Sequence, residues 1–353
     1  MAQTSDFLTV ATVDYIPRAL VTLRSAMRYG KHTGYHLFVL DATVDTIRKL
    51  PAVLGEDGSG VNFFGPFDLG SEREAFLAAF KYYNAVEMSC FAKYVALAHV
   101  FRTSSAEVCV YADADIFVVE NIGEAINEIA DGIVLVTPHT IGPTSDSREH
   151  EFLLYGWVNA GFFCVRRDSK KTHQILDWLI HRISRRGFYA PHHGISADQT
   201  WLSSLPFVFP GLIKISRNHG LNVGFWNLEQ QQLIRVDGGI HINGVPLLVF
   251  HFSGFNPAKP SQLSSYFPMD IARAGTPLGD LCLTYKNELD AIAPLGAKLT
   301  GLTRLQCSKA NLQDRMLSGS IQNGLSLVAP SIKPGLFTRI GQKMDLLLRG
   351  LIT

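Results

Sequence analysis

The chain has 353 residues, of which 47% are hydrophobic and 18% are charged, a composition typical of a globular protein with a sizeable core. The formal net charge of +1 excludes a strongly basic nucleic-acid-binding protein. There is no run of about 18 apolar residues, so the sequence predicts no membrane-spanning helix.

Short β-rich segments alternate with helical patterns through the first half of the chain. We expect strands at residues 7–13, 35–41, 61–67, 107–113, 132–138 and 158–166. Between them, apolar residues at helical spacing predict helices over about 16–27, 88–101 and 122–129. This alternation predicts an α/β fold with a mainly parallel sheet flanked by helices. From about residue 205 to residue 253 the strands become shorter, which indicates a smaller antiparallel portion, and the rest is expected to be helix and loop.

The amino-terminal segment and the cysteines bear on the compartment in which the protein is found. The amino-terminal segment has no basic region before its short apolar run, so we expect no signal peptide. The five cysteines are odd in number and far apart, with no C-x-x-C pair. This predicts reduced, mostly buried thiols in a cytoplasmic protein.

Carboxylates follow three of the expected strands: Asp14, Asp41, and the pair Asp113 and Asp115 in "VYADADIFV". Ligands of open α/β sheets bind outside the carboxyl ends of the strands. Two neighbouring carboxylates repel each other unless a cation or a shared proton lies between them, and a hard divalent ion held by oxygen ligands meets this need. The alternative is a pair of solvated turn aspartates. The apolar residues on both sides of the pair favour the metal site.

Several other polar residues stand out, each with a purely structural alternative. Lys93 lies in a helical stretch that is apolar nearly all round, so it either extends to the surface or meets an anion, which could be a phosphate or a nearby aspartate. His251 ends an apolar strand and is followed by Gly254 and Lys259, so it is either a core histidine or a metal ligand. Asp198 could simply cap a short helix.

Six segments, in order, resemble nucleotide-sugar glycosyltransferases of the GT-A fold: "FLTVATVDYIPRALVTLRSAMRY", "FAKYVAL", "VYADADIFV", "VNAGFFCVRR", "ADQTWL" and "HFSG". The likeness is to the glycogenin-like family, which includes bacterial lipopolysaccharide galactosyl- and glucosyltransferases, and to a bacterial surface-polysaccharide branch. It covers roughly residues 6–289. It implies a GT-A catalytic domain over 1–258, with a donor half of about 1–120 and an acceptor half of about 121–258. Residues 259–353 would form a helical extension.

The resemblance also implies roles for the metal and donor residues. Asp113 and Asp115 match the D-x-D motif that binds Mn²⁺ or Mg²⁺ on the donor diphosphate, and His251 matches the histidine that completes this site. Thr12, Asp14 and Tyr15 match the segment that holds uridine. Lys93 matches a basic residue that contacts the donor.

The remaining matched residues concern the transferred sugar. Asn159 and Gly161 match the segment at the donor sugar, whereas a β-bulge would be the structural alternative. Asp198 and Gln199 match a pair close to the anomeric carbon and are the expected catalytic residues. In "HFSGFNPAK", the family's lysine position is occupied by Pro257, and Lys259 comes two residues later. Gly254 and Lys259 are therefore only a partial match to the family's phosphate-binding loop.

The sequence thus predicts a metal-dependent enzyme that transfers a sugar from a nucleotide sugar, expected to be a UDP-sugar, to a glycan or lipid-linked acceptor. The resemblance suggests retention of configuration. An inverting enzyme would use a base such as His192, His193 or Asp198. Two alternatives stay open: a non-catalytic nucleotide-sugar or glycan-binding protein, and a metal-dependent phosphohydrolase, which is disfavoured because Phe117 stands where such enzymes have Thr or Val.

The last expected helix covers residues 335–352 and has one apolar face. It either packs on the domain or lies on an anionic membrane surface, which would suit a lipid-linked acceptor.

Overall fold

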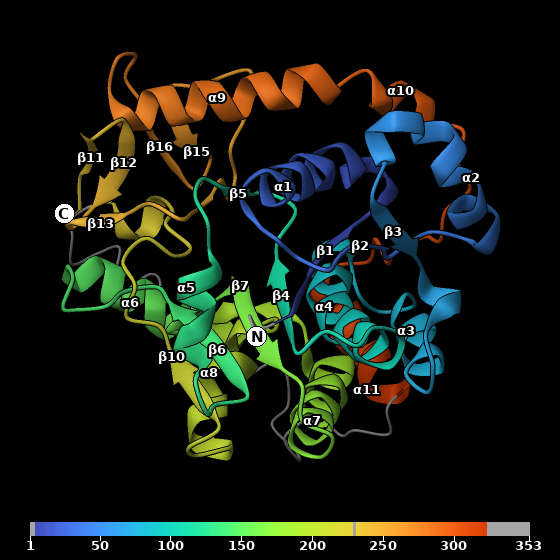
Figure 1. The fold of residues 1–353 in the computed structure, drawn as a ribbon. Coiled ribbons are helices and arrows are strands. Elements are labelled where there is room, and N and C mark those ends of the chain that lie inside the picture. The colour runs from blue at the N-terminus through green and yellow to red at the C-terminus, as the bar shows by residue number, and fades with distance from the viewer. Residues whose placement is uncertain (1–3, 229–230, 323–353) are drawn as a thin grey trace, which may run out of the picture.

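The central element of the fold is a seven-stranded sheet (Figure 1). The structure is a computed structural model that describes residues 4–228 and 231–322. In spatial order the strands are β10 (Ile213–Ile215), β6 (Val134–Pro138), β7 (Val158–Arg166), β4 (Val108–Ala112), β1 (Ser5–Ala11), β2 (Gly34–Val39) and β3 (Val61–Phe64). Only β7 runs antiparallel to its neighbours.

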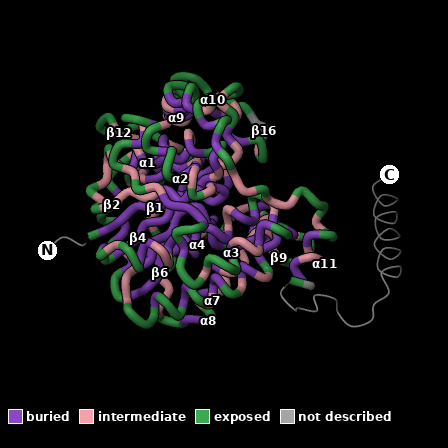
Figure 2. The backbone as a smooth tube through the Cα atoms, turned by 90° about the vertical axis from the view of Figure 1, so that its right-hand side faces the viewer, coloured by how far each residue is buried: buried purple, intermediate pink, exposed green. Residues whose placement is uncertain are grey.

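Both faces of the sheet are covered by helices, so its central strands are buried on both sides. Alternate residues of β1 point to two different cores: Phe7 and Ala11 join one, and Leu8 and Val10 join the other. The first core also contains residues of α1 (Ile16–Tyr29), α2 (Val44–Leu54), α9 (Pro277–Ile292) and α10 (Leu295–Leu299). The second contains residues of α3 (Arg73–Ala79), α4 (Ala85–Thr103), α7 (Lys171–Arg186) and α8 (Gln199–Val208). Figure 2 shows the buried strands between the more exposed outer elements.

Smaller strand pairs complete the fold. β5 (Ile116–Val118) pairs antiparallel with β14 (Val249–His251). A three-stranded antiparallel sheet joins β11 (Leu233–Val236), β12 (Gly239–Ile242) and β13 (Val245–Pro246). Two further antiparallel pairs are β8 (Tyr189–Ala190) with β9 (Ile195–Ser196), and β15 (Gln262–Ser264) with β16 (Phe267–Asp270). The remaining helices are α5 (Gly123–Ile126), α6 (Asp146–Tyr155) and α11 (Leu312–Gln322).

The predicted fold class, a mainly parallel sheet flanked by helices with a smaller antiparallel portion, is confirmed. Three details differ from the expectation. Residues 205–208 belong to helix α8, β10 joins the main sheet in parallel, and β15 and β16 form a hairpin where helix and loop were expected. Hairpins as short as this carry too little periodic pattern to be distinguished from loops.

The structure describes only part of the predicted carboxyl-terminal extension. Helices α9, α10 and α11 lie in the predicted helical extension, whereas the helix expected at 335–352 lies outside the described residues. All five cysteines are free thiols, and Cys109, Cys164 and Cys282 are buried. Within the described part of the chain, every helix is too short or too polar to cross a bilayer.

Candidate active site

The two aspartates of the D-x-D segment lie in a tight turn directly after β4. The N–H of Ile116 donates to the carbonyl oxygen of Asp113 at 3.1 Å, and the N–H of Asp113 donates to Gly161 O in β7 at 2.8 Å. From α1, the hydroxyl of Thr22 donates to the carbonyl oxygens of Ala114 and Ile116 at 2.9 and 2.7 Å. Hydrogen bonds to β7 and from α1 therefore fix this turn. Because β1 and β4 are parallel, it lies at the edge of the sheet where β1 also ends.

His251 reaches this turn from far along the sequence through the pairing of β14 with β5. In this pairing His251 lies opposite Ile116, and the N–H of Phe252 donates to Asp115 O at 2.9 Å. The imidazole Nε2 is then 3.1 Å from Oδ1 of Asp115. Asp113, Asp115 and His251 each offer one ligand atom, and these three atoms lie within 4.8 Å of one another.

This donor set fits a divalent cation. The side chains of Asp113 and Asp115 are 28% and 23% exposed, so the cluster is open to solvent on one side. Two carboxylates and one imidazole suit Mn²⁺ or Mg²⁺, with positions left for waters or substrate oxygens. Burial acts to raise the pKa of Asp115, but the charge of His251, its hydrogen bond and the charge of Arg18 together outweigh burial and hold this pKa below its usual value.

Lys93 of α4 is buried behind the aspartates. Its ammonium lies 3.1 Å from Asp113 Oδ1 and 3.2 Å from Asp198 Oδ2, and it donates to Ala160 O at 3.0 Å. Burial acts to lower the pKa of Lys93, but the attraction of Asp113 and Asp198 is stronger and raises it above its usual value. Of the alternatives for Lys93, contact with a nearby aspartate is confirmed and extension to the surface is wrong.

Asp198 belongs to the same buried ion cluster. It precedes α8, but its side chain makes no cap bond to that helix, so the simple capping explanation is wrong. Its carboxylate is 1% exposed and instead accepts hydrogen bonds from Lys93 and from the hydroxyl of Tyr94, at 3.1 Å in the latter case. The neighbouring residue Gln199 is half-buried: its Oε1 accepts from Ala160 N at 3.4 Å and its Nε2 donates to Tyr155 O at 3.0 Å.

Asn159 and Gly161 lie in β7 directly behind His251. The pairing of β6 with β7 shifts register here: Val136 pairs with Phe163, and Thr137 with Asn159. A local irregularity of the β-bulge kind is thus present. A Cβ on Gly161 would lie 2.2 Å from Cε1 of His251, so only glycine allows the imidazole to approach this strand.

The segment predicted to hold uridine follows β1 at the same edge of the sheet. Thr12 directly precedes the short helix η1 (Val13–Tyr15) without a side-chain cap bond to it, and Tyr15 is 53% exposed. The helix is held by the buried Asp41, whose Oδ1 accepts from Val13 N at 2.8 Å. Asp14 is engaged in an ion pair with Arg304 at 2.5 Å.

The loop after His251 contains Gly254 and Lys259. Gly254 has a φ of +73°, the left-handed region that favours glycine, and a Cβ there would meet Ser264 Oγ at 2.7 Å. Lys259 is exposed, in a turn closed by its N–H on Asn256 O at 2.9 Å. Arg18 of α1 approaches the same loop and donates to Phe255 O at 2.9 Å.

The structure therefore brings most of the predicted residues together but adds others that the sequence did not indicate. Lys93, Asp113, Asp115, Asn159, Gly161, Asp198 and His251 form one connected cluster. His192 and His193 are exposed in the turn between β8 and β9. The residues that sequence reasoning missed are Arg18, Tyr94, Tyr111, Thr137, His139 and Asn222. The hydroxyl of Tyr111 donates to Asp113 Oδ1 at 2.6 Å, and Thr137, His139 and Asn222 are buried polar residues in one hydrogen-bonded network with Asn159 and His251. Only Arg18 carried a signal, as a cation in the first turn of the helix after the first strand.

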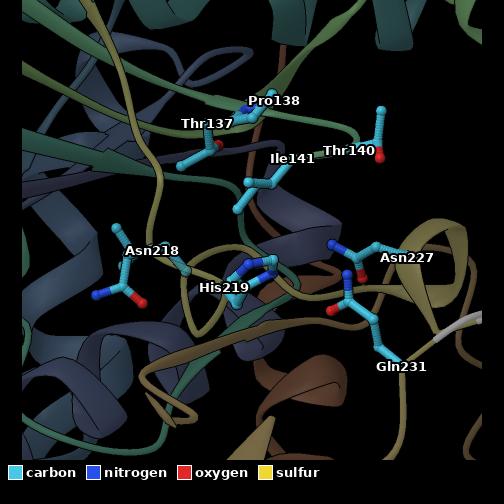
Figure 3. Close-up of a pocket in the computed structure, with 9 residues that line it drawn as sticks. Thr137, Pro138, Thr140, Ile141, Asn218, His219, Asn227 and Gln231 are labelled. Carbon is cyan, nitrogen blue, oxygen red and sulfur yellow. The ribbon is translucent and has the colours of Figure 1, made fainter. Parts of the chain in front are cut away.

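The structure also contains a small cavity and a larger open groove. One, of about 10 Å³, holds no more than a single water and is lined by residues that include Thr137, Asn218 and Asn227 (Figure 3). A more open groove of about 800 Å³ is lined mainly by the segment after β5 and by the β11–β13 sheet, including Glu120, Glu124 and His241. None of the predicted site residues lines either cavity. The candidate site is thus defined by its side-chain chemistry.

Comparisons with known proteins give weak similarities. No protein-family model matches the chain. The uncharacterized protein YfnD of Bacillus subtilis (strain 168) is 24% identical over 172 residues, which is 45% of this chain and 50% of that protein, so the chain spans about half the length of this curated relative.

Several solved glycosyltransferase structures are similar at low identity. The galactosyltransferase LgtC, in complex with donor and acceptor sugar analogs, is 16% identical with a TM-score of 0.46, covering 84% of this chain and 97% of that chain. GlyE of Streptococcus pneumoniae TIGR4 is 14% identical with a TM-score of 0.47, covering 88% of this chain and 66% of that chain. Mouse xyloside xylosyltransferase 1 is 12% identical with a TM-score of 0.40, covering 70% of this chain and 97% of that chain. At these identities the likeness says nothing about the substrate of this chain.

Proposed function

We propose that this protein is a metal-dependent glycosyltransferase that transfers a sugar from a nucleotide sugar to a glycan or lipid-linked acceptor. The observation that carries the proposal is the convergence of Asp113, Asp115 and His251 at the carboxyl edge of a parallel sheet. A solvated pair of turn aspartates would not need a histidine from a distant strand beside it. A UDP donor, retention of configuration and a role in surface-polysaccharide synthesis are parts of the proposal that rest on the sequence resemblance.

Asp113, Asp115 and His251 would hold Mn²⁺ or Mg²⁺. When bound, such an ion supplies positive charge to the diphosphate that leaves as the sugar is transferred. The local charges support this assignment. Asp113 and Asp198 share the buried ammonium of Lys93, and Asp115 contacts the imidazole of His251, so a bound cation would add positive charge to a cluster of three carboxylates.

The roles of the buried residues differ from those that the resemblance implied. Lys93 is 4% exposed and already bonded to Asp113, Asp198 and Ala160 O, so we assign it the positioning of Asp113 rather than contact with the donor. Asp198 would act through Lys93. This leaves Gln199, which is half-buried, as the proposed residue at the donor sugar.

We assign the donor nucleotide to the edge formed by Thr12, Asp14 and Tyr15. The exposed ring of Tyr15 offers a stacking surface for a base, and the guanidinium of Arg18 lies over that ring, 5.8 Å from its centroid. Arg18 also acts to lower the pKa of Asp115, behind the larger influences of burial and His251, so its charge is felt at the metal site. Arg18 and Lys259 are the proposed partners of the diphosphate, with Gly254 allowing close backbone approach.

The proposed division of the chain keeps the bounds that the resemblance implied. The donor half would be residues 1–120, the acceptor half residues 121–258, and the helical extension residues 259–353, of which the described part begins with the β15–β16 hairpin and continues with α9, α10 and α11. Contact of the amphipathic segment 335–352 with an anionic membrane stays a prediction from its sequence pattern.

The proposal is tested by comparing the wild-type protein with Asp115→Ala and a matched control, Asp177→Ala, in which an exposed aspartate of α7 is removed. We would measure Mn²⁺ binding by calorimetry, and hydrolysis or transfer with a panel of UDP-, GDP- and dTDP-sugars. Removing a metal ligand is expected to lower both Mn²⁺ affinity and turnover by about 100-fold or more, while the control stays at the wild-type values.

The other outcomes separate the alternative functions. Equal turnover in Asp115→Ala and wild type would end the metal-dependent mechanism. Binding of a nucleotide sugar without turnover of any donor would favour the binding protein. Release of phosphate from simple phosphate esters, without sugar transfer, would favour the phosphohydrolase.

A further inference from the structure

A chain of buried side-chain hydrogen bonds lies behind His251, on the side of its ring away from Asp115. The first link is between His251 Nδ1 and Asn222 Oδ1, at 3.0 Å. A neutral imidazole carries its proton on one nitrogen only, so the partner of Nδ1 decides whether Nε2 has a lone pair for a cation. The orientation of the Asn222 amide is therefore important for the metal site.

Two acceptors fix that orientation. Asn222 Nδ2 donates to Thr137 Oγ1 at 2.7 Å and to Asn159 Oδ1 at 2.9 Å. The hydroxyl of Thr137 gives its own proton to Phe162 O at 2.8 Å, so its oxygen is free to accept from Asn222. Reversing the Asn222 amide would place its carbonyl oxygen against two other oxygens.

The second acceptor, Asn159, is fixed in the same way. Its Oδ1 accepts from Gly161 N at 2.8 Å, and its Nδ2 lies 3.1 Å from His139 Nε2. His139 Nδ1 faces Gly156 O at 2.8 Å and must donate to it, which leaves Nε2 as the acceptor for Asn159. One series of hydrogen bonds runs from Asn222 through Thr137, and the other runs from Asn222 through Asn159 and His139. Both end at backbone N–H or C=O groups, whose donor or acceptor character cannot change.

Burial strongly favours these side-chain orientations over the alternatives. Thr137, His139, Asn159, Asn222 and His251 are each no more than 6% exposed, so water cannot replace a lost partner and an unpaired polar group is costly. The rings nearby restrict His251 further, since Trp226 packs edge-on against it with centroids 5.1 Å apart.

We propose that Asn222, oriented by Thr137 and by the pair Asn159 and His139, is a positioning residue that keeps the proton of His251 on Nδ1 and its Nε2 available to a divalent cation. This inference rests on the proposed function for its purpose, but the proton on Nδ1 is a property of the metal-free protein, in which Nε2 faces Asp115 Oδ1 at 3.1 Å. It also gives Asn159, which the resemblance assigned to the donor sugar, a role behind the metal ligand. Such outer partners of ligating histidines commonly change metal affinity by about 10–100-fold when removed.

The backbone at Asn222 offers a clean test. Its φ is +53°, a region in which asparagine is tolerated and glycine is unstrained. Asn222→Gly therefore removes the amide without imposing backbone strain. Asn243→Gly is the matched control, because Asn243 has a φ of +49° but is exposed in the turn between β12 and β13.

The experiment is nitrogen-15 NMR of histidine-labelled protein, with the His251 signals assigned by His251→Gln. In the metal-free protein we expect a proton on Nδ1, hydrogen-bonded to Asn222 Oδ1 and protected from exchange with solvent, in the wild type and in Asn243→Gly. In Asn222→Gly we expect this protection to be lost, because Nδ1 has no acceptor and only Nε2 keeps a partner, in Asp115. Calorimetry should show Mn²⁺ binding about 10-fold weaker or more in Asn222→Gly and unchanged in Asn243→Gly.

Two results would overturn the inference: a wild-type ring without a proton on Nδ1, or Asn222→Gly with both the wild-type Nδ1 proton signal and the wild-type Mn²⁺ affinity. Thermal unfolding of each variant shows whether it is folded, and if Asn222→Gly is not, the wild-type Nδ1 proton alone still decides. Failure of the proposed function would give a different result. The wild type would then bind no Mn²⁺ or turn over no donor, while the proton on Nδ1 would still be present.

Discussion

At the scale of single residues, the candidate site consists of the charged groups of Lys93, Asp113, Asp115 and His251, held by uncharged polar partners buried behind them. Asp113, Asp115 and His251 were recognisable because charged residues interrupt apolar strands, and Lys93 because a lysine stood among apolar neighbours. Asn222, Thr137 and His139 carry no such signal, because an isolated polar residue in a strand or loop is ordinary. Their importance comes from contacts across segments far apart in the chain.

Asp41 provides a prediction about pH. Burial raises its pKa from 3.8 to about 6, so the native state holds a proton more tightly there than the unfolded chain does. The contribution of Asp41 to stability is therefore favourable at low pH and is lost as the pH rises from about 4 through about 6.

In Asp41→Asn the carboxylate is removed, but the amide oxygen still accepts from Val13 N. We expect this variant to be more stable than wild type by about 1–3 kcal/mol at pH 7.5, with the difference disappearing below about pH 4. Denaturant unfolding at several pH values measures this, with Asp177→Asn as the exposed control. A difference that did not change with pH, or a less stable Asp41→Asn at pH 7.5, would contradict the assigned burial penalty.

At the scale of helices and strands, the regular alternation of the first half was predictable from the sequence. The buried parallel strands are continuous apolar segments, and their helices have one apolar face, so their order and type follow from periodicity. The direction of β7, the β15–β16 hairpin and the position of α11 were not predictable. Strand direction depends on pairing partners, and the placement of α11 depends on contacts with distant segments, among them the packing of Leu312 and Met316 on the second core and one buried ion pair.

That ion pair joins Arg315 of α11 to Glu87 in the first turn of α4. Glu87 is fully buried, and its other oxygen accepts from Tyr189 N at 2.9 Å, next to the turn that leads to Asp198. Removing the arginine would leave a buried carboxylate without its cation.

We expect Arg315→Ala to lower the free energy of unfolding by about 3–5 kcal/mol. The matched control is Lys286→Ala, which breaks the more exposed pair with Asp290 on α9 and should change it by no more than about 0.5 kcal/mol. Chemical denaturation of both variants makes the comparison. Equal losses in the two would mean that α11 is not held by this pair.

At the scale of the whole molecule, the sheet and the later antiparallel segments combine to build one site. The turn after β4 supplies Asp113 and Asp115, the end of β1 lies at the same edge of the sheet, and β14 returns beside β5 to supply His251. The two parts of the fold that the sequence described separately are thus joined at the candidate metal site.

The central claim is most directly tested by a crystal structure of the protein grown with Mn²⁺ and UDP, using anomalous scattering to locate the metal. The account predicts a manganese peak between the carboxylates of Asp113 and Asp115 and Nε2 of His251, with the UDP diphosphate on its open side and the base near Tyr15. A manganese peak elsewhere, or bound UDP with no metal between these three side chains, would contradict it.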